Sequence, residues 1–188
     1  MRSYKCLAVN HFSNGSYSLV PIRDEDKYQI MKWRKEQIYH LRQVKHLTEK
    51  EQDIYFQTVV SNLFEDSFPL QILFSFMKNK KCIGYGGLVH IDWENKNAEI
   101  SFVMDTNLEK NNFEEIWSLY LKLLEKIAFL ELKFHKIYTY AYDLRPKLYQ
   151  IFEKNKFQRD AVLRQHLLFN GEFINVVIHS KINPYESN

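Results

Sequence analysis

Cysteine is scarce in this chain, which has only two in 188 residues. Cys6 and Cys82 lie far apart in the sequence, and two such residues do not make the disulfide framework of a small secreted domain. We therefore expect a reducing, cytoplasmic environment. Cys82 lies in an apolar, strand-like run, so we expect its thiol to be buried.

Long apolar stretches are also missing, because no run approaches the roughly 18 residues that a membrane-spanning helix needs. The N-terminal segment MRSYKCLAVNHFSNGSYSL lacks the apolar core of a signal peptide. We therefore expect no contact with a membrane and no processing. The chain also has no internal repeat and no Pro/Gly/Ser-rich linker, so we expect residues 1–188 to form one domain.

Neither sign of charge dominates. The 26 Lys and Arg residues are balanced by 23 Asp and Glu residues, which gives a formal net charge of +3. No run of basic residues is long enough for a nucleic-acid-binding arm, so we expect no nucleic-acid partner. A mild basic patch could still attract a phosphorylated ligand.

Sequence signatures of several other enzyme classes are missing. We find no Ser-His-Asp motif signature and no Walker loop. Most of the histidines show no metal-ligand spacing, so we expect no metal site; they are His46, His90, His135, His166 and His179.

Aromatic side chains, by contrast, are abundant: they make up 15% of the chain, with 14 Phe and 12 Tyr. Hydrophobic residues amount to 45%, which is ordinary for a globular protein. A chain of this length buries about 70% of the surface that its unfolded form exposes, so it can build a core without disulfides. We expect the aromatics to fill that core, and some of them to line a cleft.

The pattern along the chain predicts a mixed α+β fold. Alternation at Tyr17 to Pro21 predicts a first strand, and two helices follow, the second opened by a Thr48–Glu51 capping box. Residues 70–105 then read as three strands separated by polar turns. A helix at about 112–130, a strand at 135–142, a short helix begun by Pro146 and a hairpin turning at Asn170–Gly171 complete the order.

Three residue blocks in this order resemble the GNAT acyltransferases over nearly the whole chain. They are IRDEDKYQIMKWRKEQ, KCIGYGGLVHIDWENKNAEISFVMD and IFEKNKF, and the second is the most specific. The nearest branch is the one that acetylates ribosomal-protein N-termini and the amino groups of nucleotide-linked sugars. The resemblance implies a mostly antiparallel central sheet with splayed strands, flanked by helices on both faces. It also implies acetyl-CoA as the co-substrate of an N-acetyltransferase.

The resemblance also implies where the co-substrate lies. The pantetheine arm would pair with the second half of the strand Ala98 to Met104, and a turn before the next helix would hold the pyrophosphate. That turn departs from the family's glycine-rich pattern, and we expect Asn residues to supply its left-handed backbone while Glu114 mildly weakens phosphate binding. The expected cofactor-binding residues are Phe102, Val103, Met104, Lys110, Asn111, Asn112, Phe113 and Arg145.

Two residues are catalytic candidates by the same resemblance. Glu99 lies in the strand where relatives place a base that takes a proton from the amine, although a strand carboxylate can also simply face solvent or pair with lysine. Phe152 replaces the family's usual tyrosine acid. Tyr149 lies one helical turn earlier and could reach the leaving sulfur, although ordinary packing also explains it.

The first two helices and the final hairpin would bind the acceptor, with Trp33, Arg34, His40 and Arg42 as candidates. The acceptor is expected to be a small amine, either an amino sugar on a nucleotide or a protein N-terminus. Two alternatives stay open, namely a GNAT-fold binding or regulatory protein without catalysis, and an interaction domain that uses exposed aromatics. We expect a monomer or a homodimer.

Overall fold

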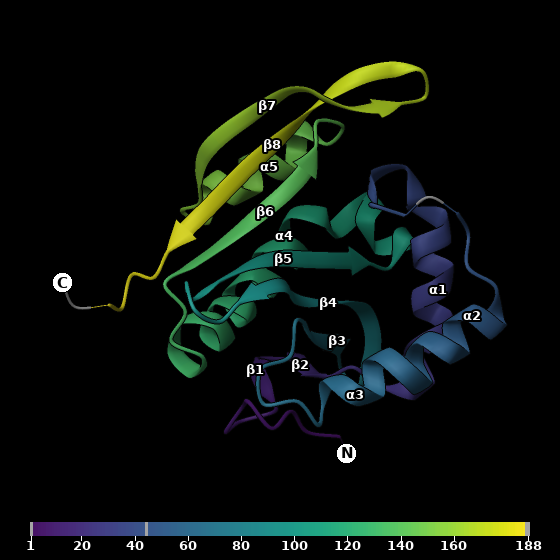
Figure 1. Ribbon diagram of the computed structural model, residues 1–188, viewed down its shortest axis with the longest axis vertical. Helices are drawn as coiled ribbons and strands as arrows, with labels where there is room; N and C mark the ends of the chain where they lie inside the picture. The colour runs from purple at the N-terminus through teal and green to yellow at the C-terminus, as the bar shows by residue number, and fades with distance from the viewer. Residues whose placement is uncertain (1, 44, 187–188) are drawn as a thin grey trace.

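The computed structural model describes residues 2–43 and 45–186. One eight-stranded sheet runs through it in the order β1-β2-β3-β4-β5-β6-β8-β7 (Figure 1). Neighbouring strands are antiparallel except β5 and β6, which are parallel. The strands are β1 Phe12–Asn14, β2 Tyr17–Pro21, β3 Ile72–Lys78, β4 Lys81–Asp92, β5 Asn97–Met104, β6 Lys136–Tyr142, β7 Gln158–Phe169 and β8 Glu172–Ile182.

Helices cover both faces of this sheet, as the sequence predicted (Figure 1). On one face, Phe102 of β5 packs against Tyr120 and Trp117 of α4. On the other, Arg34 of α1 reaches the Tyr85 hydroxyl of β4. The helices are α1 Lys27–Glu36, α2 Glu49–Ile54, α3 Ser61–Leu63, α4 Thr106–Glu125 and α5 Pro146–Lys154, and π-helical turns at Tyr55–Val60 and Lys126–Glu131 extend α2 and α4.

Several local signals fold as their chemistry requires. The Thr48 hydroxyl accepts from the Glu51 amide at 3.2 Å, and the Glu51 carboxylate accepts from the Thr48 amide at 2.9 Å, which completes the predicted capping box. Asn170 and Gly171 both have positive φ, 50° and 86°, and they turn the β7–β8 hairpin. Cys82 is buried in β4.

The start of α4 differs from the prediction. The helix begins at Thr106, not near Asn112, because the Asp105 carboxylate accepts from the Asn107 amide at 2.9 Å and caps it there. Residues 106–111 contain neither glycine nor proline, so nothing in them stops the helix. Asn112 interrupts it with φ −126° and ψ 21°. The left-handed turn expected at Asn111–Asn112 is therefore wrong.

Strands β5 and β6 splay apart, as predicted. They pair only through Asn97↔Lys136, Ala98↔Ile137 and Glu99↔Tyr138. Beyond this point β5 continues beside β4 as far as Met104, while β6 continues beside β8 as far as Tyr142. The main-chain groups on the facing edges of the two strands therefore have no strand partner after Glu99.

A close approach of β4 to β5 fixes the strand beside this opening. The Tyr120 hydroxyl of α4 donates to the Ser101 carbonyl at 2.7 Å. A Cβ atom at Gly86 would lie 2.0 Å from that carbonyl oxygen and 2.7 Å from the Tyr120 hydroxyl. Only glycine therefore fits at this position without moving the strand backbone.

We predict that Gly86→Ala lowers the free energy of unfolding by about 3 kcal/mol, because a backbone oxygen must shift to admit the methyl group. Gly15→Ala is the control: no atom lies within 4 Å of its new Cβ, and only its φ of +60° opposes the change. That strain amounts to about 1–2 kcal/mol. Urea denaturation measures both variants. An equal or smaller loss in Gly86→Ala would show that the approach of the strands is not rigid.

Candidate active site

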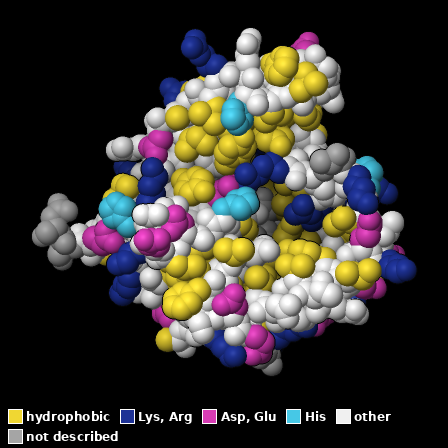
Figure 2. All heavy atoms as spheres, in the orientation of Figure 1, with side chains coloured by type: hydrophobic (Ala, Val, Ile, Leu, Met, Phe, Trp, Pro, Cys, Tyr) yellow, Lys and Arg dark blue, Asp and Glu magenta, His cyan; other side chains and the backbone are white. Residues whose placement is uncertain are grey.

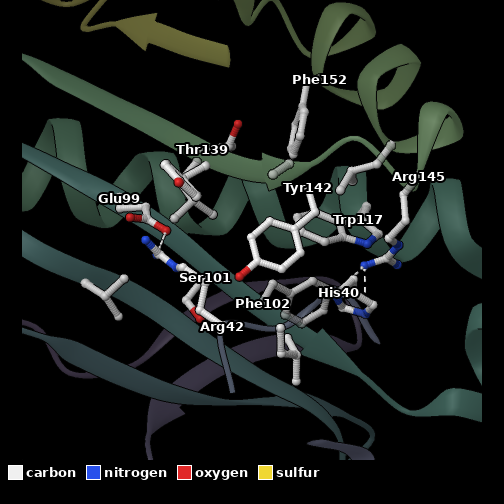
Figure 3. A pocket seen from close by; sticks show the side chains of 16 residues that line it. His40, Arg42, Glu99, Ser101, Phe102, Trp117, Thr139, Tyr142, Arg145 and Phe152 are labelled. Carbon is white, nitrogen blue, oxygen red and sulfur yellow. Dashed lines mark hydrogen bonds and ion pairs between the residues drawn. The ribbon is translucent and has the colours of Figure 1, made fainter. Parts of the chain in front are cut away.

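A cavity of about 130 Å³ occupies the opening between β5 and β6. Its walls come from both strands, from α4 and α5, and from residues 40–42 (Figure 3). Its lining side chains include His40, Arg42, Glu99, Ser101, Phe102, Trp117, Thr139, Tyr142, Arg145 and Phe152.

An aromatic cluster forms the apolar wall of the cavity. Phe102 stacks on Tyr120 with ring centroids 3.8 Å apart and an interplanar angle of 9°. Trp117 meets Phe102 edge-on at 4.8 Å and Phe152 at 5.7 Å. Since all four rings are buried, this wall is tightly packed and its shape is fixed before any ligand binds.

Trp117 also brings an unused hydrogen-bond donor to this wall. Its indole Nε1 is buried and has no acceptor among the described residues. Leaving a buried donor unpaired costs about 1–3 kcal/mol. Trp117 lines the cavity, but this nitrogen has almost no accessible surface, so a ligand carbonyl can reach it only if neighbouring side chains shift.

Glu99 lies buried where β5 and β6 separate, and an arginine and a histidine contact its carboxylate. The Arg42 guanidinium donates to one oxygen, and His90 Nδ1 lies 2.9 Å from the other. Arg42 in turn lies 4.7 Å from the centre of the Tyr140 ring on β6. The carboxylate is therefore already paired, and any group that approaches it from the cavity must share or displace Arg42.

A second ion pair lies at the α5 end of the cavity. Arg145 Nη2 donates to the Glu109 carboxylate at 2.5 Å, and its guanidinium lies 5.0 Å from the Phe113 ring centre. Arg145 Nη1 lies 3.1 Å from His40 Nε2. Burial and the Arg145 charge lower the pKa of His40 to about 3, so its imidazole is neutral near pH 7.

Residues 40–42 thus connect the two sides of the opening, with His40 against α5 and Arg42 against β5. Figure 2 shows a hollow near the middle of this face with Lys and Arg side chains at its rim. Two arginines that line the cavity, Arg42 and Arg145, are each paired with a carboxylate, so the charge at the rim is largely compensated.

The expected cofactor-binding residues are not all brought together. Phe102 and Arg145 line the cavity, whereas the side chains of Val103 and Met104 are buried beside it, and the Met104 carbonyl already accepts from Gln37 Nε2 at 2.7 Å. The other four lie on α4 outside the cavity lining, two exposed and two half-buried; these are Lys110, Asn111, Asn112 and Phe113.

Three expectations about single side chains need correction. Tyr149 does not line the cavity, and its hydroxyl lies 3.1 Å from two acceptors outside the lining, the Tyr142 carbonyl and the Asp143 carboxylate. Trp33 is only 1% exposed and belongs to the core, so it cannot contact an acceptor. Glu114 points to α5, where it accepts from Lys154 Nζ at 2.6 Å, and its charge is partly neutralised there.

The sequence did not predict that Tyr142 and Trp117 belong to the site, although both line the cavity. Figure 3 shows the Tyr142 ring standing in the cavity with its hydroxyl pointing toward β5. Burial raises the pKa of this phenol, which keeps it protonated. Tyr142 ends the strand that precedes Arg145, where the two splayed strands are apart. This position was the feature of the sequence that could have indicated that Tyr142 lines the site.

Of the expected acceptor residues, His40 and Arg42 line this cavity and Arg34 lines another one, between α1 and β4. Within residues 2–43 and 45–186, no three His, Cys, Asp or Glu side chains are grouped to hold a metal ion. No helix in the same ranges is long and apolar enough to cross a membrane.

Several solved structures share this fold. A spermidine N-acetyltransferase from Vibrio cholerae, in complex with CoA and spermine, superposes with a TM-score of 0.79 at 16% identity, covering 90% of this chain and 97% of that one. A dodecameric structure of the same enzyme gives 0.74 at 17% identity, with 90% and 95% covered. No curated protein matched the chain in sequence.

A family model described as an acetyltransferase (GNAT) domain matches residues 19–178, which is most of the chain. Together with the fold, this match establishes what the splayed sheet and the second residue block indicated. The chain belongs to the GNAT acetyltransferase family, whose members are acetyl-CoA-dependent N-acyltransferases.

Proposed function

We propose that this protein transfers an acetyl group from acetyl-CoA to a primary amine in the cavity between β5 and β6. The observation that carries the proposal is the loss of pairing between these strands after Glu99↔Tyr138, with a cavity in the opening. The exposed strand edge can hydrogen-bond the amides of a pantetheine arm, as an added strand would. The unpaired Trp117 Nε1 can bind one of its carbonyl oxygens once neighbouring side chains shift.

The pyrophosphate would lie near Lys110 to Phe113. Lys110 is exposed and cationic, and Asn112 is where the helical dihedrals of α4 are disturbed. Main-chain N–H groups near such an interruption can bind a phosphate. Glu109 holds Arg145, so phosphate binding by Arg145 requires that ion pair to open.

In the proposed reaction, Glu99 takes a proton from the acceptor amine, directly or through water. The neutral amine attacks the thioester carbonyl, a C–N bond forms, and the C–S bond breaks as the sulfur takes a proton to leave as CoA. The attacking nitrogen then loses a second proton, which restores the proton that the acid gave to the sulfur. Tyr142 replaces Tyr149 as the candidate that donates a proton to the sulfur, because its protonated phenol points into the cavity.

The acceptor is an amine, and an amino sugar on a nucleotide or a protein N-terminus remains the proposed class. Arg42 and Arg145 at the cavity could bind a phosphorylated sugar if their ion pairs open. A second function, a GNAT-fold binding or regulatory protein without catalysis, is favoured by one observation. Residues 106–111 form a helix that pairs with Arg145 where the family has a phosphate-binding turn.

A cytoplasmic location is part of the proposal. Both cysteines, Cys6 and Cys82, are free thiols in the structure. Free thiols persist in a reducing compartment.

We predict that acetyl-CoA binds in calorimetric titration with an affinity in the range of about 1 μM to 1 mM, where substrate KM values usually fall. A thiol-release assay against a panel of amines should then show release that depends on the amine. Failure to bind at millimolar acetyl-CoA, or binding with no release for any amine, would support the non-catalytic alternative.

We predict that the Trp117 N–H contributes to acetyl-CoA affinity. Replacing Trp117 by β-(3-benzothienyl)alanine keeps the ring shape and removes the N–H, and affinity should fall about fivefold to tenfold. The same replacement at Trp93 is the control, because its Nε1 donates to the Pro69 carbonyl at 2.9 Å, away from the cavity. Equal affinities for the two analogues would contradict the assignment.

We predict that Glu99→Gln lowers kcat by about 10²–10⁴-fold and changes the pH–rate profile, because the amide cannot accept the proton. Glu125→Gln is the control, since Glu125 is also largely buried and paired, with Lys181 at 2.8 Å, and does not line the cavity. An unchanged pH–rate profile in Glu99→Gln would reduce Glu99 to a partner of Arg42.

A further inference from the structure

A second cavity, of about 150 Å³, lies between α1, the helical stretch after Thr48 and strand β4. Its lining contains one charged side chain, Arg34, and no carboxylate. The remaining lining residues are polar, aromatic or aliphatic: Ile22, Ile30, Leu47, Gln52, Tyr55, Phe56 and Tyr85.

The structure holds the Arg34 guanidinium in place without neutralising it. Its Nε donates to Gln43 Oε1 at 2.7 Å, and its Nη1 donates to the Tyr85 hydroxyl. Both acceptors are neutral, and no carboxylate of the described residues lies within ion-pair distance. Nη2 has no acceptor among those residues, so one edge of the planar fork remains available to an anion.

The other two arginines near the reaction centre differ in this respect. Arg42 is paired with Glu99, and Arg145 is paired with Glu109. Arg34 is therefore the guanidinium of this region whose charge the described residues leave uncompensated. A partly buried positive charge without a counter-ion is unfavourable unless a ligand supplies one.

Arg34 also lies on the face from which an acceptor would approach. Paired residues of neighbouring strands share a face, and the register places Gly87 opposite Ser101 and Val89 opposite Glu99. Tyr85, which holds Arg34, precedes them on the same face of β4. At about 3.4 Å per residue, the backbone of Tyr85 lies about 7 Å from that of Gly87 and about 14 Å from that of Val89.

One short segment connects the two cavities. Arg42 lines the first of them, and the next residue, Gln43, bonds Arg34 at the second. An acceptor with its amine at Glu99 could therefore extend past residues 41–43 and place a second group at Arg34.

We propose that the acceptor carries an anionic group, a carboxylate or a phosphate, that Arg34 binds through its free edge. This inference rests on the proposed function, and it makes Arg34 a specificity-determining residue. It also separates this chain from its structural neighbour, which is described in complex with spermine. A polyamine brings positive charge, which Arg34 would repel.

Amines matched in shape but not in charge test the proposal. The probes must span the roughly 14 Å between Glu99 and the strand position of Tyr85, which about four extended residues do. The tetrapeptide amides Ala-Ala-Ala-phosphoserine and Ala-Ala-Ala-Ser form the phosphate arm, and Ala-Ala-Ala-Glu and Ala-Ala-Ala-Gln form the carboxylate arm. In the wild-type protein we expect at least one anionic member to bind at least tenfold more tightly than its neutral counterpart. Spermidine should bind no better than the neutral amines.

Binding is measured by calorimetry on the protein saturated with CoA, where no transfer can occur, and kcat/KM is measured separately with acetyl-CoA. Arg34→Gln should bring the ratio between the matched amines to about one, and Arg34→Lys should restore part of it. Lys35→Gln is the control, because it removes the same charge from an exposed position on α1 and should keep the wild-type ratio.

The inference is overturned if neither pair differs in binding, if no amine binds, or if Arg34→Gln keeps the wild-type ratio. The proposed function fails in a different way. Selective binding at Arg34 without any acetyl transfer would contradict catalysis and support the anion site. Equal acetyl transfer to anionic and neutral acceptors would support catalysis and contradict the anion site.

Discussion

The separation of β5 from β6 after Glu99 is the constraint on which the rest of the site depends. Each strand keeps a full partner on its other edge, β4 for β5 and β8 for β6, so neither is held to the other beyond three residue pairs. The aromatic cluster around Phe102 and Trp117 packs against this opening from the α4 side. An edge that is neither paired nor closed leaves main-chain N–H and C=O groups available for hydrogen bonds.

One unpaired hydrogen-bond donor and two ion pairs lie at this wedge between β5 and β6. Trp117 Nε1 lacks an acceptor, while Arg42 and Arg145 are held by carboxylates from other elements. These ion pairs compensate partly buried charges in the protein without a ligand. In the proposed function, the co-substrate and the acceptor would exchange for some of these internal contacts.

The sequence predicted the features that short-range chemistry decides. Thr48 and Glu51 cap a helix, Asn170–Gly171 turns a hairpin, and the AEISFVMD strand diverges as its resemblance to the family implied. Contacts between distant residues were not predictable from one sequence. Arg42 and Glu99 are 57 positions apart, and helical periodicity alone could not show that Trp33 is in the core while Arg34 faces a cavity. At α4 the family pattern suggested a turn, whereas Asp105 starts the helix earlier.

The central claim is that the wedge between β5 and β6 binds the co-substrate, and a crystal structure of the protein with CoA tests it most directly. The account predicts a pantetheine arm lying along β5 beyond Glu99, with main-chain hydrogen bonds to the edge that faces β6 and the thiol close to Glu99 and Tyr142. CoA bound elsewhere, or strands that pair along their whole length when CoA is present, would contradict the account.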